Sequence, residues 1–195
     1  MKARFGDQIV LERRSFPLRP APDPSVRFQG TYREAGWRRA AAAGAADGVT
    51  YRMWERDDYP TWSLPAQEAA KGAAAQGAEA FERVHFALFE AFFAKGRNIA
   101  VREEVLGVVR EAGLDMGRFR QDFDAARFRG EVLREYQEAH DRYGITAIPT
   151  VIFCAAAGDR PPEGDEVRLT GAVPGTDYEQ VLTSRFRLRP VPPRP

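Results

Sequence analysis

The only thiol in the sequence is that of Cys154, so these 195 residues cannot run a two-cysteine thiol-disulfide cycle by themselves. A single cysteine also excludes an internal disulfide and a zinc site made of cysteines alone. Cys154 follows residues 151–153 on a predicted core strand, and free cysteines are among the most buried residues in proteins. We therefore expect a structural thiol at this position rather than a reactive one.

The two histidines, His85 and His140, are the other candidates for acid-base or metal chemistry, and both lie in segments with a helical pattern. His85 stands within an apolar stripe, which favours a packed helix histidine over a catalytic base. His140 lies near the end of its predicted helix, where a cation meets the favourable end of the helix dipole. The two are far apart in the sequence, so we assign no catalytic residue and no metal site.

The composition excludes some classes of partner. The chain has 29 Lys and Arg against 28 Asp and Glu, a net charge of +1, with both signs mixed throughout. Nucleic-acid binding needs a basic patch or stripe, so no nucleic-acid partner is expected. No apolar stretch is long enough for a signal peptide or a membrane span. With 44% hydrophobic residues the chain can bury a sizeable core, and we expect a soluble, cytoplasmic protein without a membrane partner.

The N-terminal part of the sequence predicts one strand and one helix, separated by loops. Residues 8–16 are rich in strand formers, and two prolines soon afterwards end any ladder. Residues 31–46 form an alanine-rich helical segment. The loop of residues 51–65 carries large aromatic side chains, which we expect to cover the core rather than line a substrate groove. These residues are Trp54, Tyr59 and Trp62.

From residue 64 to residue 144 the pattern is helical. Ser63 is a candidate N-cap, and Pro65 suits the first turn of a helix. Apolar residues then recur every three or four positions, which predicts a broad buried stripe. The stripe consists of Phe81, Val84, His85, Leu88, Phe89, Phe92 and Phe93, and further helices are expected at residues 98–112, 115–124 and 125–143.

The period then changes from helix to strand. Residues 145–154 are β-branched and apolar, and residues 166–171 give a second strand. Glycines and prolines at 158–164 separate the two, as in a β-hairpin with a long loop. Residues 175–185 return to a helical pattern, and the prolines of residues 188–195 indicate an extended or disordered tail.

The order of these elements, with several short stretches, resembles the DsbA-like branch of the thioredoxin superfamily. A strand, a long all-helical insertion, the pattern Gly-Ile-x-x-Ile-Pro-Thr at residues 144–150, a hairpin and a terminal helix follow one another as in that family. The sequence is most similar to the subgroup called FrnE-like or DSBA oxidoreductase, which is related to chromene-carboxylate isomerases and kappa-class glutathione transferases. The other matching stretches are residues 12–20, 65–71, 76–82, 87–93 and 97–99.

The resemblance implies an α/β fold, a thioredoxin-like sheet with an inserted all-helical subdomain. Residues 1–63 and 145–187 would form the thioredoxin-like domain, N-terminally incomplete. Residues 64–144 would form the helical insertion, and residues 188–195 a proline-rich tail.

The resemblance also places a substrate-binding site at Ile148 and Pro149. It implies a cis peptide between them, beside the active site, with the backbone of Ile148 pairing with an extended peptide or a thiol ligand. The residues alone allow a plainer interpretation, in which Pro149 only starts a strand, because only roughly 5% of X-Pro bonds in folded proteins are cis. The surrounding Gly-Ile-x-x-Ile-Pro-Thr pattern favours the cis peptide.

The main departure from the family lies at the N-terminus. There a first strand leads to a helix that begins with Cys-x-x-Cys, or a serine variant, whereas residues 2–7 here look like the end of that helix and its turn. A start codon assigned too late, a relic that closes the gap by rearrangement or dimerisation, and a fragment without its head are all compatible with this. We favour the late start.

Three functions fit these expectations. The first is a DsbA-family thiol-disulfide oxidoreductase homologue, inactive in dithiol exchange as written because the active-site cysteines are absent. The second is a glutathione-dependent transferase or isomerase, which an upstream serine would mark, and the third is a non-catalytic peptide-binding module. The resemblance implies a protein or small-molecule thiol substrate. No cofactor is expected, and the sequence leaves the redox partner and the oligomeric state open.

Overall fold

The computed structural model of the chain describes residues 1–155 and 166–192. The chain divides into two compact units, which are described separately: unit 1 is Met1–Arg14 with Glu138–Pro195, and unit 2 is Ser15–Gln137. These limits come from contacts within the chain and differ from the domain limits expected from the sequence, so the division at 63/64 and 144/145 stays a prediction. Among the described residues, no helix combines the length and the apolar character needed to cross a bilayer.

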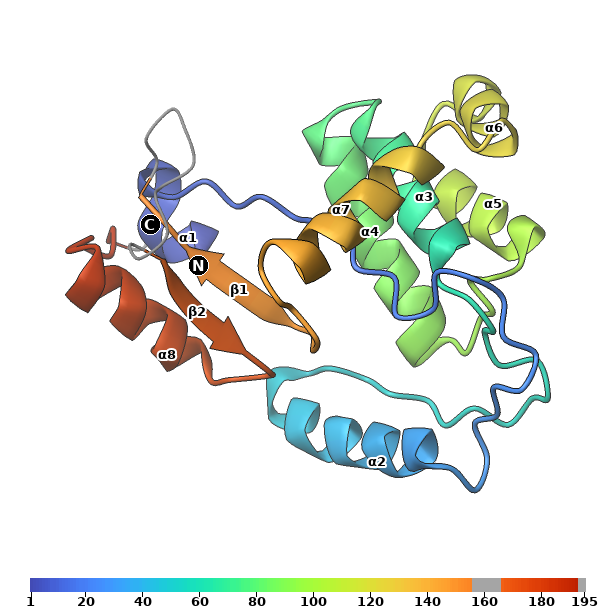
Figure 1. The fold of residues 1–195 in the computed structure, drawn as a ribbon, viewed down its shortest axis with the longest axis horizontal. Helices are drawn as coiled ribbons and strands as arrows, with labels where there is room; N and C mark the ends of the chain where they lie inside the picture. Colours follow the sequence, from blue (N-terminus) through green and yellow to red (C-terminus); the bar gives the residue numbers. More distant parts are fainter. Residues whose placement is uncertain (156–165, 193–195) are drawn as a thin grey trace. The chain divides into compact units, whose positions relative to one another are not determined.

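Unit 1 is built on a two-stranded antiparallel sheet (Figure 1). Thr150 pairs with Thr170 at one end of the ladder, and Phe153 pairs with Val167 at the other. The ring of Phe153 lies 6.1 Å from the ring of Tyr178 and 6.4 Å from that of Phe186, so the C-terminal helix packs on the sheet. The elements are α1 (Lys2–Phe5), η1 (Gly6–Gln8), the end of α7 (Arg129–Asp141), β1 (Thr150–Phe153), β2 (Val167–Thr170), α8 (Gly175–Gln180) and the π-helical turn η4 (Val181–Arg185).

The two ends of the chain meet within unit 1. The backbone N–H of Val191 donates to the carbonyl oxygen of Arg4 at 2.7 Å, and the side-chain amide of Gln8 donates to the carbonyl oxygen of Arg189 at 2.8 Å. The guanidinium of Arg4 also pairs with Glu179 on α8 at 2.7 Å. Residues from both ends are therefore needed to complete this unit.

The prediction of a strand at residues 8–16 is wrong. Ile9 has extended dihedral angles, φ −126° and ψ 142°, but residues 9–16 form no strand in the structure. Val10 is 84% exposed and Leu11 is 50% exposed. β-branched residues favour an extended backbone, but a strand also needs a neighbouring strand for its ladder, and the sequence pattern does not supply one.

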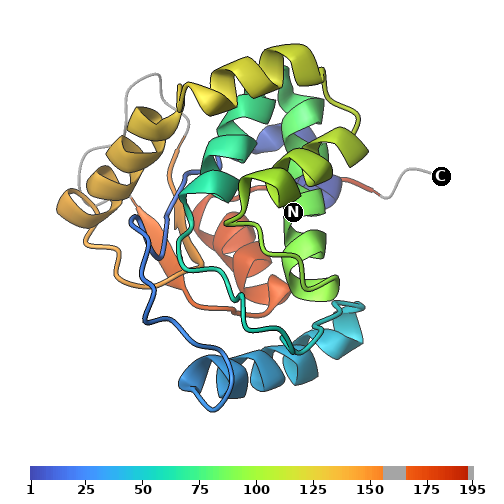
Figure 2. The same cartoon turned by 90° about the vertical axis from the view of Figure 1, so that its right-hand side faces the viewer.

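Unit 2 is helical, and Figures 1 and 2 both show α3, α4 and α5 side by side. The helix expected at residues 31–46 is confirmed, and its N-cap Thr31 accepts a hydrogen bond from the N–H of Arg33 at 3.2 Å. The helices expected after residue 63 are confirmed with shorter limits. The elements are α2 (Tyr32–Gly44), η2 (Ala45–Asp47), α3 (Leu64–Ala74), α4 (Ala78–Phe89), the π-helical turn η3 (Glu90–Ala94), α5 (Arg102–Glu111), α6 (Met116–Asp124) and most of α7.

Ser63 does not cap α3, as the sequence suggested. Its hydroxyl oxygen instead accepts a hydrogen bond from the backbone N–H of Arg19 at 3.2 Å, and its own N–H donates to the carbonyl oxygen of Arg19 at 2.9 Å. Pro65 lies in the first turn as expected. The Ser63 hydroxyl thus binds the backbone of Arg19, which is distant in the sequence, and does not cap α3.

Unit 2 has two hydrophobic cores. The first lies among α3 to α6, and the second gathers aromatic rings from α2, η3 and the loop before α3. Burying one large apolar side chain stabilises a fold by about 1.5–3 kcal/mol, so each core is a major source of stability. The buried members of the first are Ala69, Ala73, Ala80, Val84, Leu88, Ala91, Val105, Leu106, Val108, Val109, Leu114 and Phe119, and those of the second are Val26, Phe28, Trp37, Trp54 and Tyr59.

Two of the three aromatic loop residues pack in a core as expected, whereas Trp62 is half-buried and belongs to neither core, and the stripe on α4 is narrower than expected. Trp54 and Tyr59 are buried in the second core. Val84 and Leu88 face the first core, but Phe89 is 50% exposed and packs with its ring 4.9 Å from that of His85. A helix buries about one stripe against its neighbours, so residues one step around the helix reach the surface.

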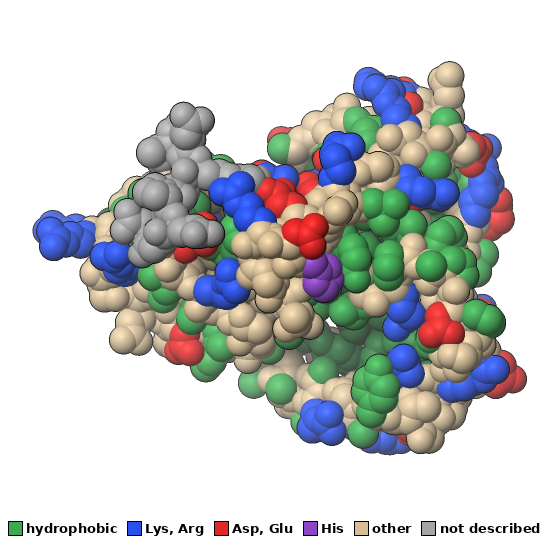
Figure 3. Space-filling model, in the orientation of Figure 1, with side chains coloured by type: hydrophobic (Ala, Val, Ile, Leu, Met, Phe, Trp, Pro, Cys, Tyr) green, Lys and Arg blue, Asp and Glu red, His purple; other side chains and the backbone are tan. Residues whose placement is uncertain are grey.

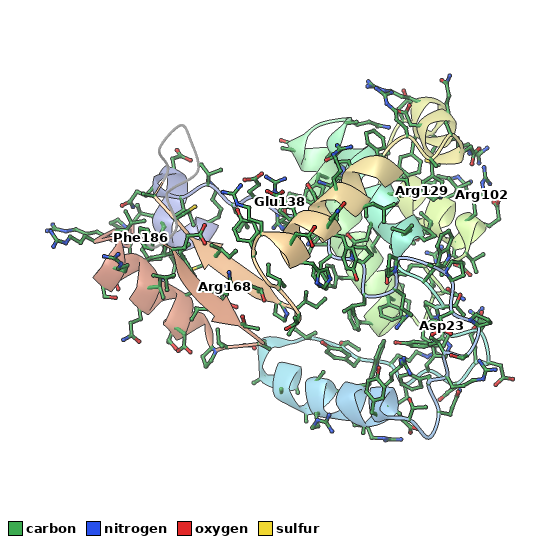
Figure 4. All side chains as sticks on the ribbon, in the orientation of Figure 1. Asp23, Arg102, Arg129, Glu138, Arg168 and Phe186 are labelled. Atoms are coloured by element: carbon green, nitrogen blue, oxygen red, sulfur yellow. The ribbon has the colours of Figure 1, made fainter. Side chains whose placement is uncertain are left out.

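A buried ion pair connects α3, α7 and the segment that enters unit 2. Glu135 accepts hydrogen bonds from Lys71 Nζ and from the backbone N–H of Ser15, both at 2.6 Å. Burial by itself raises the pKa of Glu135, but these two hydrogen bonds outweigh it and hold the pKa below its ordinary value. A second pair joins Arg129, labelled in Figure 4, to buried Glu68 at 2.6 Å. These pairs fix α7 against α3.

Candidate functional site

The site predicted at Ile148 and Pro149 lies in unit 1, in the turn between α7 and β1. Gly144 ends the helical path with a positive φ of 56°, a conformation that costs glycine little. The N–H of Gly144 donates to the carbonyl oxygen of His140 at 3.1 Å, and the N–H of Ile145 donates to that of Ala139 at 2.9 Å. These bonds turn the chain out of the helix toward the strand.

The expected strand at residues 145–154 is therefore shorter, and β1 begins only at Thr150. The peptide bond between Ile148 and Pro149 is cis in this structure. The carbonyl oxygen of Pro149 accepts a hydrogen bond from the N–H of Gly171 at 2.8 Å, which extends the contact between the two strands by one residue.

Thr150 braces the turn that precedes it. Its hydroxyl donates to the carbonyl oxygen of Ala147 at 2.7 Å and lies 3.3 Å from the hydroxyl of Thr170 on the partner strand. The bond to Ala147 closes a short loop around Ile148 and Pro149. Thr150 and Gly171 are positioning residues that sequence reasoning did not single out, although Thr150 is the last letter of the Gly-Ile-x-x-Ile-Pro-Thr pattern.

Ile148 lies at the surface of unit 1. The residue is 44% exposed, and Pro149 is also exposed. Within residues 1–155 and 166–192, neither the N–H nor the carbonyl oxygen of Ile148 has a hydrogen-bond partner. Free backbone groups of this kind form main-chain hydrogen bonds with an extended ligand.

The prediction of a buried, structural thiol at Cys154 is also wrong, because Cys154 is exposed. It follows the last residue of β1, at the opposite end of that strand from Pro149. Five residues of extended chain span about 16 Å. The structure therefore does not bring the thiol beside the Ile148 backbone.

The histidines are not part of this turn. His140 lies in the last turn of α7, as expected, and is half-buried. His85 belongs to unit 2, where its ring stacks on Phe81 at 5.3 Å, as expected for a packed helix histidine. The described part of the chain holds no group of three or more His, Cys, Asp and Glu side chains placed to hold a metal ion. The expected turn of residues 158–164 lies outside the described residues.

Comparison with known proteins identifies the family of the chain. The sequence matches the family described as "DSBA-like thioredoxin domain" over residues 43–186, which is most of the chain. The fold, a hairpin and terminal helix combined with a helical body, is the thioredoxin-like DsbA fold. The chain belongs to the DSBA-like thioredoxin domain family.

Solved structures support the same fold. Eight chains of known structure match, among them a "putative protein disulfide isomerase" from Nitrosomonas europaea, with a TM-score of 0.63 and 17% sequence identity. The match covers 86% of this chain and 77% of that one. At this identity the likeness establishes the fold alone. No curated protein matches the sequence.

Proposed function

We propose that the chain is a DsbA-family thiol-disulfide oxidoreductase homologue that binds an extended, thiol-bearing peptide at Ile148 and Pro149, and that these 195 residues do not perform dithiol exchange. The proposed peptide binding is supported by the exposed residue Ile148, whose N–H and carbonyl oxygen are unpaired among the described residues. The proposed lack of dithiol exchange is supported by the single cysteine, because a dithiol cycle needs two thiols that form and release an internal disulfide.

The proposed binding mode is main-chain pairing. The N–H of Ile148 donates to a carbonyl oxygen of the peptide, and its carbonyl oxygen accepts from a peptide N–H. The bond from Thr150 to Ala147 and the bond from Gly171 to Pro149 hold this backbone in place before the ligand arrives. A backbone fixed in advance loses less entropy on binding, so these bonds raise affinity without touching the ligand.

The test is a fluorescence anisotropy titration with a labelled peptide that contains one reduced cysteine. Thr150→Val keeps the shape of the side chain but removes the hydroxyl that holds Ala147. A typical net hydrogen bond contributes about 1 kcal/mol, so we expect about fivefold weaker binding. The matched control is Thr176→Val on α8, an exposed residue whose hydroxyl, within the described part of the chain, hydrogen-bonds only to the neighbouring Asp177 at 3.4 Å.

Equal affinities of the Thr150→Val and Thr176→Val proteins for the peptide would contradict this site. A disulfide-reduction assay tests the second half: with an external thiol as reductant, the 195-residue protein should not accelerate reduction of a disulfide substrate. Titration with glutathione in place of the peptide separates this function from a glutathione-dependent transferase, for which glutathione would be the tighter ligand.

A further inference from the structure

The strand β1 has one open edge. Among the described residues the sheet of unit 1 has two strands, so β2 pairs with one edge of β1 and no strand pairs with the other (Figure 1). The N–H of Gly171 donates to the carbonyl oxygen of Pro149, and these two residues lie opposite each other, one step beyond Thr150 and Thr170. They therefore form a hydrogen-bonded pair of the ladder.

The alternation of this ladder decides which backbone groups face the open edge, because pairs that exchange hydrogen bonds alternate with pairs that do not. Thr150 and Thr170, one step from Pro149, form a pair of the second kind. Ile152 and Arg168, two steps further, form another. The 3.3 Å approach of the two threonine hydroxyls agrees with this, because side chains lie closer in such pairs. The N–H and carbonyl oxygen of Thr150 and Ile152 thus point away from β2, toward the open edge.

These outward groups extend the unpaired backbone that begins at Ile148. Within residues 1–155 and 166–192, the N–H and carbonyl oxygen of Thr150 and of Ile152 have no hydrogen-bond partner, as found above for Ile148. Every second residue from Ile148 to Ile152 therefore offers a donor and an acceptor. An unpaired strand edge of this kind is a template for an added strand.

The side chains of β1 do not protect this edge. Proteins commonly block an open edge with charged side chains or with a proline that removes a donor. β1 reads Thr-Val-Ile-Phe and carries no charge, although charged side chains of both signs are present on the face of unit 1 that Figure 3 shows. Pro149 lacks its N–H on the side that faces β2, so it removes no donor from the open edge.

We infer that the peptide site proposed at Ile148 continues along β1, so that the peptide adds a third strand to the sheet and also pairs with Thr150 and Ile152. This inference rests on the function proposed above and specifies its ligand. The ligand is an extended segment of at least five residues, because the row from Ile148 to Ile152 spans about 13 Å. Its side chains beside β1 are uncharged, because this strand offers them no opposite charge.

A peptide fits this edge better than a second copy of the chain. A specific interface between two folded proteins buries about 1,200–2,000 Å² in total. A strand of four residues supplies only a small part of that area. Peptides that bind by strand addition gain their affinity from main-chain hydrogen bonds instead, so a short edge is sufficient for them.

The first experiment methylates the backbone nitrogens of the ligand one at a time. A capped, fluorescein-labelled peptide of seven alternating threonines and valines, with the central residue replaced by a reduced cysteine, is titrated into the full 195-residue protein. Only every second N–H of an added strand points toward β1. Methylation of these alternate nitrogens should weaken binding about fivefold each, the effect of one lost hydrogen bond. Methylation of the nitrogens between them is the matched control and should change the affinity little.

The second experiment uses Cys154 as a reporter, because its exposed thiol directly follows β1. Two peptides carry a cysteine at one end or the other as a mixed disulfide with 2-thiopyridine. The Cys154 thiolate attacks the peptide sulfur, forms a disulfide with it and releases pyridine-2-thione, which is followed by absorbance. A peptide along β1 has one end beside Cys154 and the other beside Ile148. One peptide should therefore react about tenfold or more faster than the other, because a tethered group reaches millimolar effective concentration.

Three outcomes would overturn the inference. A loss of affinity confined to one peptide nitrogen would limit the pairing to Ile148 and leave the function proposed above intact. Equal reaction rates of the two end-activated peptides would show that the peptide does not follow β1. A dimer that the peptide dissociates would show that a second copy occupies the edge. Failure of every peptide to bind would overturn the proposed function together with this inference.

Discussion

Cys154 exposes the only thiol of the chain directly after the last residue of β1. Because the side chain is accessible in the folded state, we expect one equivalent of thiol per chain to react with a chromogenic disulfide reagent without denaturant. The reaction is followed by absorbance, with Cys154→Ser as the blank. A thiol that reacts only after a denaturant is added would contradict the exposed position.

The earlier expectation of a buried thiol rested on the general tendency of free cysteines and on the apolar residues before it. Ile152 and Phe153 are indeed half-buried on β1. The ladder ends at Phe153, however, and the pattern of apolar residues cannot locate the last hydrogen bond of a strand to within one residue. The Ile148 turn could be predicted only from the resemblance, since the bonds from Thr150 and Gly171 depend on the hairpin partner.

Helix α6 illustrates how an element of unit 2 is fixed at its start. Asp115 Oδ1 accepts a hydrogen bond from the N–H of Gly117 at 2.9 Å, which caps the helix. The backbone of Asp115 also exchanges two hydrogen bonds of 3.0 Å with the side-chain amide of Gln76, at the turn between α3 and α4. The cap and the amide thus attach α6 to the neighbouring helices.

Asp115→Ala should lower the free energy of unfolding by about 1 kcal/mol, the usual effect of losing an N-cap side chain. Urea unfolding followed by circular dichroism measures this change. Asp115→Asn is the control, because an asparagine side chain also accepts the cap hydrogen bond and should leave most of the stability. A similar loss in both variants would show that the cap is not the cause.

Helices were predicted better than strands, for a physical reason. A helix satisfies its backbone groups within its own segment, so periodicity and caps such as Thr31 and Asp115 indicate it locally. A strand depends on a partner elsewhere in the chain, which is why residues 8–16 were wrongly predicted.

Over the whole molecule, stability should depend on pH through the buried Glu135 pair. The folded state holds the pKa of Glu135 below its ordinary value of 4.5, so the ionised carboxylate stabilises the fold fully at every pH above that value. This contribution disappears as the pH falls through the lower folded pKa. Glu135→Gln should therefore destabilise unit 2 by about 2 kcal/mol at pH 7 and by much less at pH 3.

Tryptophan fluorescence is suited to this measurement, because all three tryptophans, Trp37, Trp54 and Trp62, lie in unit 2. Urea unfolding of the unsubstituted protein and of Glu135→Gln, each at pH 7 and at pH 3, gives the difference in their free energies of unfolding at each pH. The control is Glu90→Gln, which removes an ion pair whose two side chains are more than half exposed and should have a small effect at both pH values. A Glu135→Gln effect that is constant with pH would contradict the role assigned to this carboxylate.

The meeting of the two chain ends in unit 1 bears on the order in which the protein assembles during synthesis. Arg4 and Gln8 precede unit 2 in the sequence, whereas their partners, Val191 and Arg189, follow it. Unit 2 is a continuous segment that is complete once Gln137 has been added. On the ribosome, all residues of the helical unit are therefore present before Arg4 and Gln8 can meet their partners, so unit 1 can close only after the segment that follows unit 2 has been made.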